Sequence, residues 1–268
     1  MKIFEIHSKT ALSKSRLAGL KYALNPYRGC AHGCGYCYAP SVLHVSSSDW
    51  GEWVGIKINL PNLLPKELRE KERGTIGIGT VTDPYQPAEK DYKITRYSLE
   101  QILKADWPIV IQTKSDLVLR DLDLLRKFSR VEVIMTITTL NDAHRALLEA
   151  NSPSIEKRLF ALKKLSSGGI PTCIFLGPAY PSISIGEIPR MVERFVETGA
   201  AELIVDKLNL KNGIQEKINL ALRNNKDLQN LFERDSNAGY YTLLFKEIEK
   251  ECKGKIKFTD STRGKYEE

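Results

Sequence analysis

The sequence predicts an α/β fold in which a parallel sheet is covered by helices, formed by residues 1–268 as a single domain. Two observations support this prediction. Short apolar runs rich in β-branched residues alternate with amphipathic stretches, and the runs begin about every 25–40 residues, the length of one βα unit. Continuous apolar strands of this kind are typical of parallel sheets that are buried on both faces.

Strands are predicted at each apolar run, after a first short strand that leads into the cysteine-rich segment. The five runs are TIGIGTV (75–81), WPIVIQT (107–113), VEVIMTITT (131–139), IPTCIFLGP (170–178) and AELIVDKL (201–208). Amphipathic helices are expected between the strands, and Asn141 is placed as the N-cap of one of them. These helices are expected at 94–105, 119–128, 141–150, 154–169 (which ends at a glycine pair) and 187–200.

Six such units form either an open doubly wound sheet or a partial barrel, because a complete eight-fold barrel needs more chain. In both architectures the catalytic and ligand-binding residues lie at the carboxyl ends of the strands. The core of the domain is expected at about residues 20–210. Residues 211–268 are expected to form helices that pack around this core.

Composition indicates a globular protein of the cytoplasm. No apolar run approaches the roughly 20 residues of a membrane span, and the first residues lack the apolar segment of a secretion signal. The net charge of +7 would suit a polyanionic partner such as nucleic acid. The basic residues are, however, spread among almost as many acidic ones, as on an ordinary solvated surface, so charge alone leaves nucleic-acid binding open.

Three of the five cysteines lie in NPYRGCAHGCGYCYAP (25–40), with the spacing C-x3-C-x2-C. Cytosolic thiols stay reduced, so clustered cysteines there are more often metal ligands or redox centres than disulfides. The two other cysteines stand apart in the sequence. Cys173 is expected to be a small buried apolar residue, and no role is assigned to Cys252.

The residues of this segment allow three interpretations. A zinc site would need His32 or His44 as a fourth ligand, and sharing Cys34 between two ligand pairs is an unusual way to build a tetrahedron. A thioredoxin-like pair would use Cys34 and Cys37 but leaves Cys30 unexplained. An iron–sulfur cluster bound by three cysteines leaves one iron open, and a catalytic metal requires an open position.

The spacing, directly after a first strand, resembles the signature of the radical S-adenosylmethionine (SAM) enzymes. With GIGTVTDPYQPAEKDYKITR (77–96), QTKSD (112–116) and SPSIEKR (152–158), it resembles the spore photoproduct lyase-like, or DNA repair photolyase-like, branch from about residue 10 to about 210. The resemblance implies a partial (β/α)6 TIM-like barrel with extra C-terminal helices. It also implies a [4Fe–4S] cluster and SAM, which is cleaved to a 5′-deoxyadenosyl radical that abstracts hydrogen from a substrate.

The resemblance also implies residue roles. The cluster ligands are Cys30, Cys34 and Cys37, and Tyr38 matches a tyrosine that serves radical relay or substrate positioning. Apart from the resemblance, we expect Tyr85, the second predicted catalytic tyrosine, to line the barrel mouth together with Gln86 and Tyr180. Lys114 matches a lysine that binds the SAM carboxylate, and Tyr36 occupies a position whose backbone faces the SAM adenine. The remaining expected SAM contacts are Thr82, Asp83, Thr136, Thr138, Ser154 and Arg158.

The pattern of residues adds local support to some of these roles. Thr136 and Thr138 share one strand face, and Ser154 and Arg158 share one helix face, so each pair can converge on one ligand. A lysine at the mouth of a strand, such as Lys114, needs an anion.

One position departs from the family's pattern. Thr80 stands where the spore enzyme has the cysteine that returns a hydrogen atom, and a threonine O–H bond is too strong for that step. The thymine-dimer reaction is therefore not expected, and the substrate is not identified. A one-electron donor such as ferredoxin or flavodoxin is an expected partner. The alternative functions are a DNA-repairing or RNA-modifying radical SAM enzyme and a non-enzymatic zinc-binding module.

Overall fold

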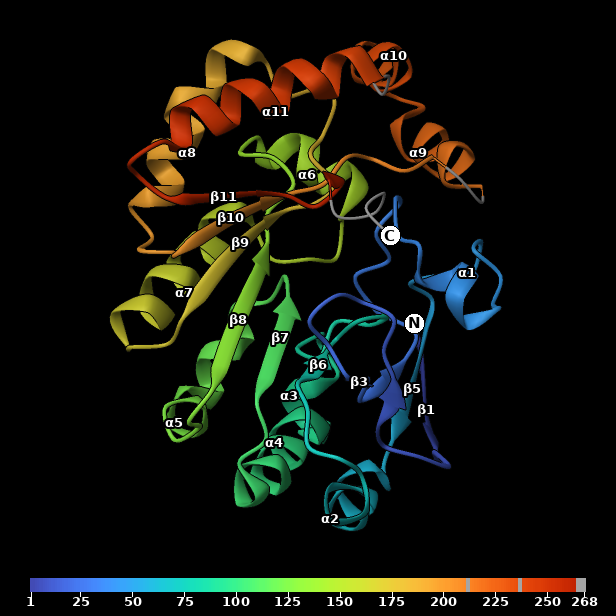
Figure 1. Ribbon diagram of the computed structural model, residues 1–268. Coiled ribbons are helices and arrows are strands. Elements are labelled where there is room, and N and C mark those ends of the chain that lie inside the picture. Colours follow the sequence, from blue (N-terminus) through green and yellow to red (C-terminus); the bar gives the residue numbers. More distant parts are fainter. Residues whose placement is uncertain (211–212, 236–237, 264–268) are drawn as a thin grey trace.

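The computed structural model describes residues 1–210, 213–235 and 238–263, which form a curved parallel sheet covered by helices (Figure 1). The strand order in the larger sheet is β11-β10-β9-β8-β7-β6-β3-β2, and only β2 runs antiparallel to its neighbour. Its strands are β2 (Ser13–Lys14), β3 (Tyr22–Leu24), β6 (Ile76–Ile78), β7 (Ile109–Thr113), β8 (Val131–Thr136), β9 (Thr172–Leu176), β10 (Glu202–Val205) and β11 (Lys257–Asp260). The six predicted units correspond to β3 and β6 through β10.

The C-terminal part contains one strand that the sequence did not predict. β11 pairs in parallel with β10 and extends the sheet by a seventh parallel strand. Residues 211–268 were expected to be helical, and their described part contains three helices and this strand. The segment KFTD is short and lies among charged residues, so it carries no apolar run from which a strand could be predicted.

Helices cover the outer side of the sheet, and in Figure 1 α11 (Ala238–Cys252) lies above β11. Helix α4 has the predicted bounds, and the side chain of Asn141 accepts bonds from Ala143 N and His144 N at the start of α6, as expected of its N-cap. The helix expected at 119–128 is divided into a 3-10 turn (Asp116–Asp121) and α5. The helices are α1 (Ala39–Leu43), α2 (Leu60–Glu70), α3 (Glu89–Tyr92), α4 (Ile94–Ala105), α5 (Leu122–Leu125), α6 (Asp142–Leu148), α7 (Ile155–Ser167), α8 (Ile188–Val196), α9 (Ile214–Leu222), α10 (Lys226–Asp235) and α11 (Ala238–Cys252).

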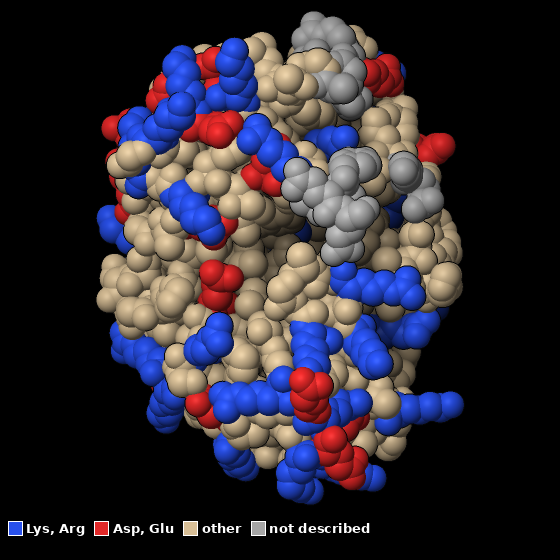
Figure 2. All heavy atoms as spheres, viewed as in Figure 1, with Lys and Arg blue, Asp and Glu red and all other residues tan. Residues whose placement is uncertain are grey.

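A second, smaller sheet lies beside the first strands of the barrel. It has the order β1-β5-β4, formed by β1 (Lys2–Ile6), β4 (Tyr27–Arg28) and β5 (Trp53–Lys57). Figure 2 shows that Lys and Arg side chains predominate over the lower right of this face, where Figure 1 draws this sheet and α2. No helix among the described residues combines the length and apolarity needed to cross a bilayer.

The two faces of the large sheet differ in burial. Ile109 and Ile111 of β7 are fully buried under the helices, whereas Val110 and Gln112 on the other face, here called the inner face, are half-buried. The apolar runs of the sequence suggested burial on both faces. The inner face is open instead because the curved sheet encloses space there. Thr136 of β8 belongs to the same face, because β8 Ile134 pairs with Gln112 and side chains alternate.

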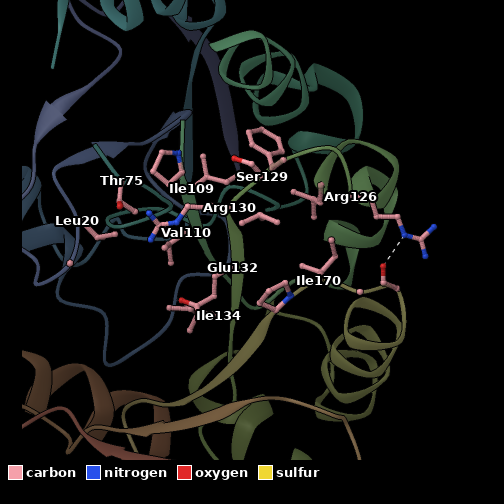
Figure 3. Close-up of a pocket in the computed structure, with 18 of the residues that line it drawn as sticks. Leu20, Thr75, Ile109, Val110, Arg126, Ser129, Arg130, Glu132, Ile134 and Ile170 are labelled. Atoms are coloured by element: carbon pink, nitrogen blue, oxygen red, sulfur yellow. Dashed lines mark hydrogen bonds between the residues drawn. The ribbon is translucent and has the colours of Figure 1, made fainter. Parts of the chain in front are cut away.

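A large cavity of about 880 Å³ occupies the amino end of the inner face (Figure 3). Val110, Glu132 and Ile134 line it, together with Arg130 from the segment before β8. The carboxyl ends of the same strands face a different and smaller cavity. The predicted cluster ligands and Lys114 lie at that opposite end.

Candidate functional site

The cysteine segment forms a tightly turned loop between β4 and α1. Gly33 N donates to Cys30 O over 3.2 Å, and Cys37 N donates to Cys34 O over 3.1 Å. Each of these bonds closes a turn that starts at a cysteine, so the three side chains are brought back to one region. Gly29 precedes the first cysteine with φ +84°, and an added Cβ would lie 2.6 Å from Trp53 O. Only glycine fits there.

The segment after β6 holds this loop in place. Thr82 Oγ1 donates to Gly29 O over 2.6 Å, and Ala31 N donates to Gln86 Oε1 over 2.8 Å. These two bonds fix the backbone on both sides of Cys30. Thr82 and Gln86 also bond to each other, from Gln86 Nε2 to Thr82 Oγ1 over 3.0 Å. The motif TDPYQ therefore fastens the cysteine loop to the carboxyl end of β6.

Asp83 is the centre of a second buried cluster. Its carboxylate accepts bonds from Thr113 Oγ1 at 2.7 Å and from Lys114 N at 2.7 Å, and it lies 3.4 Å from His32 Nδ1. Burial alone would raise the pKa of Asp83, but the charge of His32 and these donors lower it to about 2. The carboxylate thus remains ionised and ties the end of β7 to the cysteine loop.

A cavity of about 100 Å³ at the carboxyl ends of the strands brings the predicted residues together. It is lined by the three cysteines, by Lys114 after β7 and by Thr136 at the end of β8. Its further lining residues are His32, Tyr38, Ala39, Trp50, Gly79, Thr80, Val81, Thr82, Asp83, Gln112 and Thr113. Of the residues expected to bind SAM, the cavity therefore gathers Thr82, Asp83, Lys114 and Thr136.

The chemistry of the thiols at this cavity fits an iron–sulfur cluster. All five cysteines are free, and Cys30, Cys34 and Cys37 all line this cavity. In the described part of the chain, no three His, Cys, Asp or Glu side chains are placed to ligate one metal ion. A four-iron cluster binds each thiolate to a different iron, so its ligands surround a space instead of meeting at a point.

A lysine whose ammonium is buried beside the cysteines also points to a negatively charged group. Lys217 Nζ of α9 is buried and has no hydrogen-bond partner among the described residues. Burial lowers the pKa of Lys217, and the neighbouring Cys37 and Cys34 counteract this shift. Burial raises the pKa of Cys37 to about 11. Thiolates bound to iron would satisfy this cation, as neutral thiols do not.

Lys114 occupies the position on the cavity wall that the sequence predicted. Its Nζ lies 5.7 Å from the centroid of the Tyr36 ring and forms no hydrogen bond or ion pair with the described residues. Burial would lower the pKa of Lys114, but Cys34 and Glu149 raise it, so the ammonium stays charged. An unpaired ammonium at a cavity wall is suited to a carboxylate ligand.

Glu149 is fully buried and holds a network that the sequence did not indicate. Its carboxylate accepts bonds from the Tyr36 hydroxyl, from Arg158 Nη2 and, over 3.1 Å, from Thr138 Oγ1. Arg158 is fully buried as well and also donates to Thr136 O over 3.0 Å. Although burial opposes it, the charges of Arg158 and Lys114 lower the pKa of Glu149 to about 2. The network fixes β8 against α7 and the cysteine loop.

The structure places four of the eight expected SAM contacts outside the lining of the cavity: Thr138, Ser154, Arg158 and Tyr36, whose expected contact is through its backbone. The donors of Arg158 are used by Glu149 and by neighbouring backbone and side-chain oxygens. Ser154 is the N-cap of α7 and accepts a bond from Lys157 N over 3.4 Å. Thr138 lies beyond the end of β8 and turns towards Glu149. Sharing a face of one element did not bring these side chains to the cavity.

The structure buries the expected lining residues Tyr85, Gln86 and Tyr180, and none of the three lines the cavity. Tyr85 and Tyr180 have 1% and 0% of their surface exposed, and the hydroxyl of neither has a partner among the described residues. The ring of Tyr180 packs edge-on against Tyr36 at 5.9 Å. Gln86 holds the cysteine loop instead. The structure thus places Tyr85 outside the cavity that Tyr38, the other predicted catalytic tyrosine, lines.

Tyr38 lies at the rim of the cavity, as its expected role requires. Its side chain is half exposed, and its hydroxyl donates to Thr80 O over 2.6 Å. The Thr80 side chain is hydrogen-bonded to Asn25, whose Nδ2 donates to Thr80 Oγ1 over 3.0 Å. Tyr38 and Thr80 together form the edge between the cavity and the space outside it.

Acid is expected to destabilise the chain through Glu149. Its pKa in the folded state, about 2, lies below the ordinary value of about 4.3. The stabilisation from the ionised carboxylate is therefore fully present above about pH 4.3 and is lost as the pH falls through about 2. Urea unfolding of the wild type and of Glu149→Gln across this range should show a steeper loss in the wild type. Equal slopes would contradict this assignment.

Sequence reasoning missed Glu149, Gln112, Trp50 and Lys217. Trp50 packs with Cys30 and Ala39 in an apolar cluster at the cavity. Gln112 belongs to the quoted segment QTKSD, and its position on the inner face could have been inferred from strand alternation. Glu149 and Trp50 lie in segments without a motif, so no signal in one sequence marks them.

A partial barrel with three closely spaced cysteines and a free lysine at the carboxyl ends of its strands defines a class of proteins that use SAM as a radical source. The chain belongs to the radical SAM superfamily, whose sequence pattern matches residues 24–195. Membership supports SAM-cleaving radical chemistry.

Several relatives share most of the barrel region. An uncharacterized protein of Methanocaldococcus jannaschii is 40% identical over 184 residues, which are 68% of this chain and 70% of that protein. An uncharacterized protein of Mycobacterium tuberculosis is 28% identical over 221 residues, 77% of this chain and 65% of the relative. A radical SAM Nalpha-GlyT isomerase of Pseudomonas phage M6 is 24% identical over 183 residues. The chain spans 65% of the mycobacterial protein and 38% of the isomerase, which is less than two thirds of each.

Solved structures confirm the predicted fold class. A spore photoproduct lyase variant with bound AdoMet and dinucleoside spore photoproduct superposes with a TM-score of 0.74 at 13% identity, covering 96% of this chain and 81% of the lyase. Streptococcus suis SuiB bound to S-adenosylmethionine gives a TM-score of 0.54 at 16% identity, covering 89% and 49%. At these identities the likeness establishes the fold, a partial TIM-like barrel of the radical SAM type.

Proposed function

We propose that the chain is a radical SAM enzyme in which Cys30, Cys34 and Cys37 hold a [4Fe–4S] cluster with one iron left for SAM. The observation that carries this proposal is the cavity where the three free thiols meet the unpaired Lys114. When bound, the cluster supplies the electron that cleaves SAM to methionine and a 5′-deoxyadenosyl radical, which takes a hydrogen atom from the substrate. A ferredoxin or flavodoxin of the cytoplasm would be a suitable electron donor.

The chain's own residues would bind SAM from three sides. Lys114 would pair with the carboxylate of the methionine moiety, and Thr136 offers a hydroxyl on the inner face. The backbone of Tyr36, between two of the cysteines, would face the adenine. Thr82 and Asp83 act mainly by holding the loop and the end of β7, since their polar atoms are already bonded.

The substrate would reach the radical at the rim formed by Tyr38 and Thr80. The exposed side chain of Tyr38 is placed to touch a substrate there, which supports a positioning or relay role. Thr80 cannot return a hydrogen atom as a thiol does, and its hydroxyl is bonded to Asn25. We therefore propose hydrogen abstraction from a substrate other than a thymine dimer.

The test is anaerobic reconstitution with iron and sulfide, followed by dithionite and SAM. Formation of 5′-deoxyadenosine, with about four irons and four sulfides per chain, is the expected result. Protein that binds no iron and sulfide, or that yields no 5′-deoxyadenosine when loaded, would overturn the proposal. Zinc bound tightly by protein purified without oxygen would favour the zinc-binding alternative.

Replacing Lys114 with methionine is expected to weaken SAM binding by about 10–100-fold, because a charge-assisted bond to the carboxylate is lost. The iron and sulfide content should be unchanged, since Lys114 is not a ligand. Equilibrium binding of SAM to the reconstituted variant measures the effect. The exposed Lys127→Met serves as the control and should bind SAM as the wild type does. If both variants bind SAM with equal affinity, Lys114 does not contact SAM.

A further inference from the structure

A groove of about 590 Å³ lies directly outside the rim of the cysteine cavity. Tyr38, Thr80 and Val81 line both spaces, so a molecule in the groove borders the candidate active site. The groove is formed by the segment around β2, by β4 and β5, and by the end of α1. Its volume lies within the range of about 300–1,000 Å³ that is usual for small-molecule sites.

The charge of this groove is of one sign. Lys14, Arg16, Arg28 and Lys57 line it, and its described lining residues include no Asp or Glu. None of the four cations forms an ion pair with a described residue. In the same chain, arginines such as Arg194 are paired with carboxylates, here Glu156 at 2.9 Å. The groove thus concentrates positive charge that the protein itself does not neutralise.

Two of the cations are held by the backbone of the small sheet. Arg28 of β4 pairs with Gly55 of β5, and Lys57 lies two residues further along that strand. Arg28 Nη2 donates to Leu43 O over 3.2 Å, which places the guanidinium towards the end of α1. Burial, with the nearby charge of Arg28, lowers the pKa of Lys57 to about 8. A bound anion would relieve this repulsion.

We propose that this groove binds a phosphate-bearing part of the substrate and so places the reacting carbon at the rim of the cysteine cavity. The proposal rests on the proposed radical SAM function and names the substrate class of that site. Two arginines can bind phosphate oxygens in pairs and two lysines add point charges, a set suited to an anion of more than one charge. Free phosphorylated metabolites and the phosphates of a nucleic acid share this chemistry.

The test compares ligands that differ only in the phosphate. Reconstituted protein saturated with SAM is titrated with uridine and with uridine 5′-monophosphate, and we expect the phosphate to tighten binding at least about 10-fold. Lys14→Gln/Arg16→Gln removes two exposed cations whose side chains bond to no described residue, so the fold should be kept. This variant should lose most of the gain from the phosphate.

The matched control is Lys127→Gln/Lys163→Gln, which removes the same charge from exposed lysines outside the groove. Its affinity for the phosphate ligand should change less than about 2-fold. The proposal is overturned if uridine binds as tightly as its monophosphate, or if both double variants lose affinity equally. Formation of 5′-deoxyadenosine without substrate should persist in Lys14→Gln/Arg16→Gln. Its absence in the wild type would instead refute the proposed function, whatever the groove binds.

A second variant tests Lys57 by pH. The titratable or charged groups of the groove are Lys14, Arg16, Tyr27, Arg28, Tyr38 and Lys57. Because burial and the charge of Arg28 lower the pKa of Lys57 to about 8, binding of the monophosphate should weaken as the pH rises through about 8. Lys57→Arg should remove this dependence, and a dependence that persists in this variant would contradict the role of Lys57.

A short oligouridylate distinguishes the two sources of phosphate. If the substrate is a nucleic acid, the oligomer should bind more tightly than the monophosphate and with a steep salt dependence, because several phosphates are contacted. If it is a phosphorylated metabolite, the two ligands should bind equally. Either result supports a phosphate-binding groove, provided the groove variant weakens the binding.

Discussion

Cys34→Ala is expected to abolish reductive cleavage of SAM, with a loss of 5′-deoxyadenosine formation of about 100-fold or more. Mutating a residue that merely contacts a metal ligand already lowers metal affinity or activity by about 10–100-fold, and losing a ligand should cost more. Cys34 is buried between the turn that follows Cys30 and the turn that leads to Cys37, so no other thiol can take its place. The variant should also retain less iron and sulfide after anaerobic reconstitution. Cys37→Ala should behave in the same way.

The control for this experiment is Cys252→Ala, which removes a thiol that is buried in α11 and lines no part of the cysteine cavity. It should retain the iron, the sulfide and the activity of the wild type. The far-UV circular dichroism of all variants tests whether they fold. A Cys34→Ala protein that folds and keeps the full iron and sulfide content would exclude Cys34 as a ligand.

Glu149→Gln is expected to lower the free energy of unfolding by about 3–5 kcal/mol, because it leaves Arg158 charged, buried and without its carboxylate. Neither side chain of this pair has any exposed surface. The other bonds of Arg158 go to Ser152 Oγ at 2.6 Å, Pro153 O at 2.9 Å and Thr136 O at 3.0 Å, and these neutral acceptors do not neutralise its charge. Urea denaturation measures the effect.

The exposed pair of Glu156 and Arg194 provides the comparison, since it joins α7 to α8 at the surface. Glu156→Gln should cost only about 0–1 kcal/mol, because solvent screens the exposed charges. Replacing both buried partners, as Glu149→Gln/Arg158→Met, should recover part of the loss. If Glu149→Gln is no more costly than Glu156→Gln, the buried pair does not stabilise the fold as described.

The carboxyl ends of the strands could be located from the sequence, but the direction of each side chain there could not. Lys114 and Thr136 were predicted at the cavity and lie at it. Arg158 was expected beside them from the family resemblance, with its spacing to Ser154 as local support. It turns inward because Glu149, which is nine residues away, offers a buried carboxylate. The spacing of two residues along a helix predicts that they lie on the same face. It does not predict which side chains that face will contact.

The sequence by itself determined the parallel α/β fold, the cysteine loop and the lysine at the strand mouth. These features depend on local patterns: apolar runs, the C-x3-C-x2-C spacing and a charge after a strand. Only the tertiary structure decided that Glu149 engages Arg158 and that Gln86 fastens the loop. It also joined the basic groove to the cavity at Tyr38. Some of these contacts join segments that are far apart in the chain, and others depend on which side chain fills a buried position. No local sequence pattern specifies either the distant partner or the buried side chain.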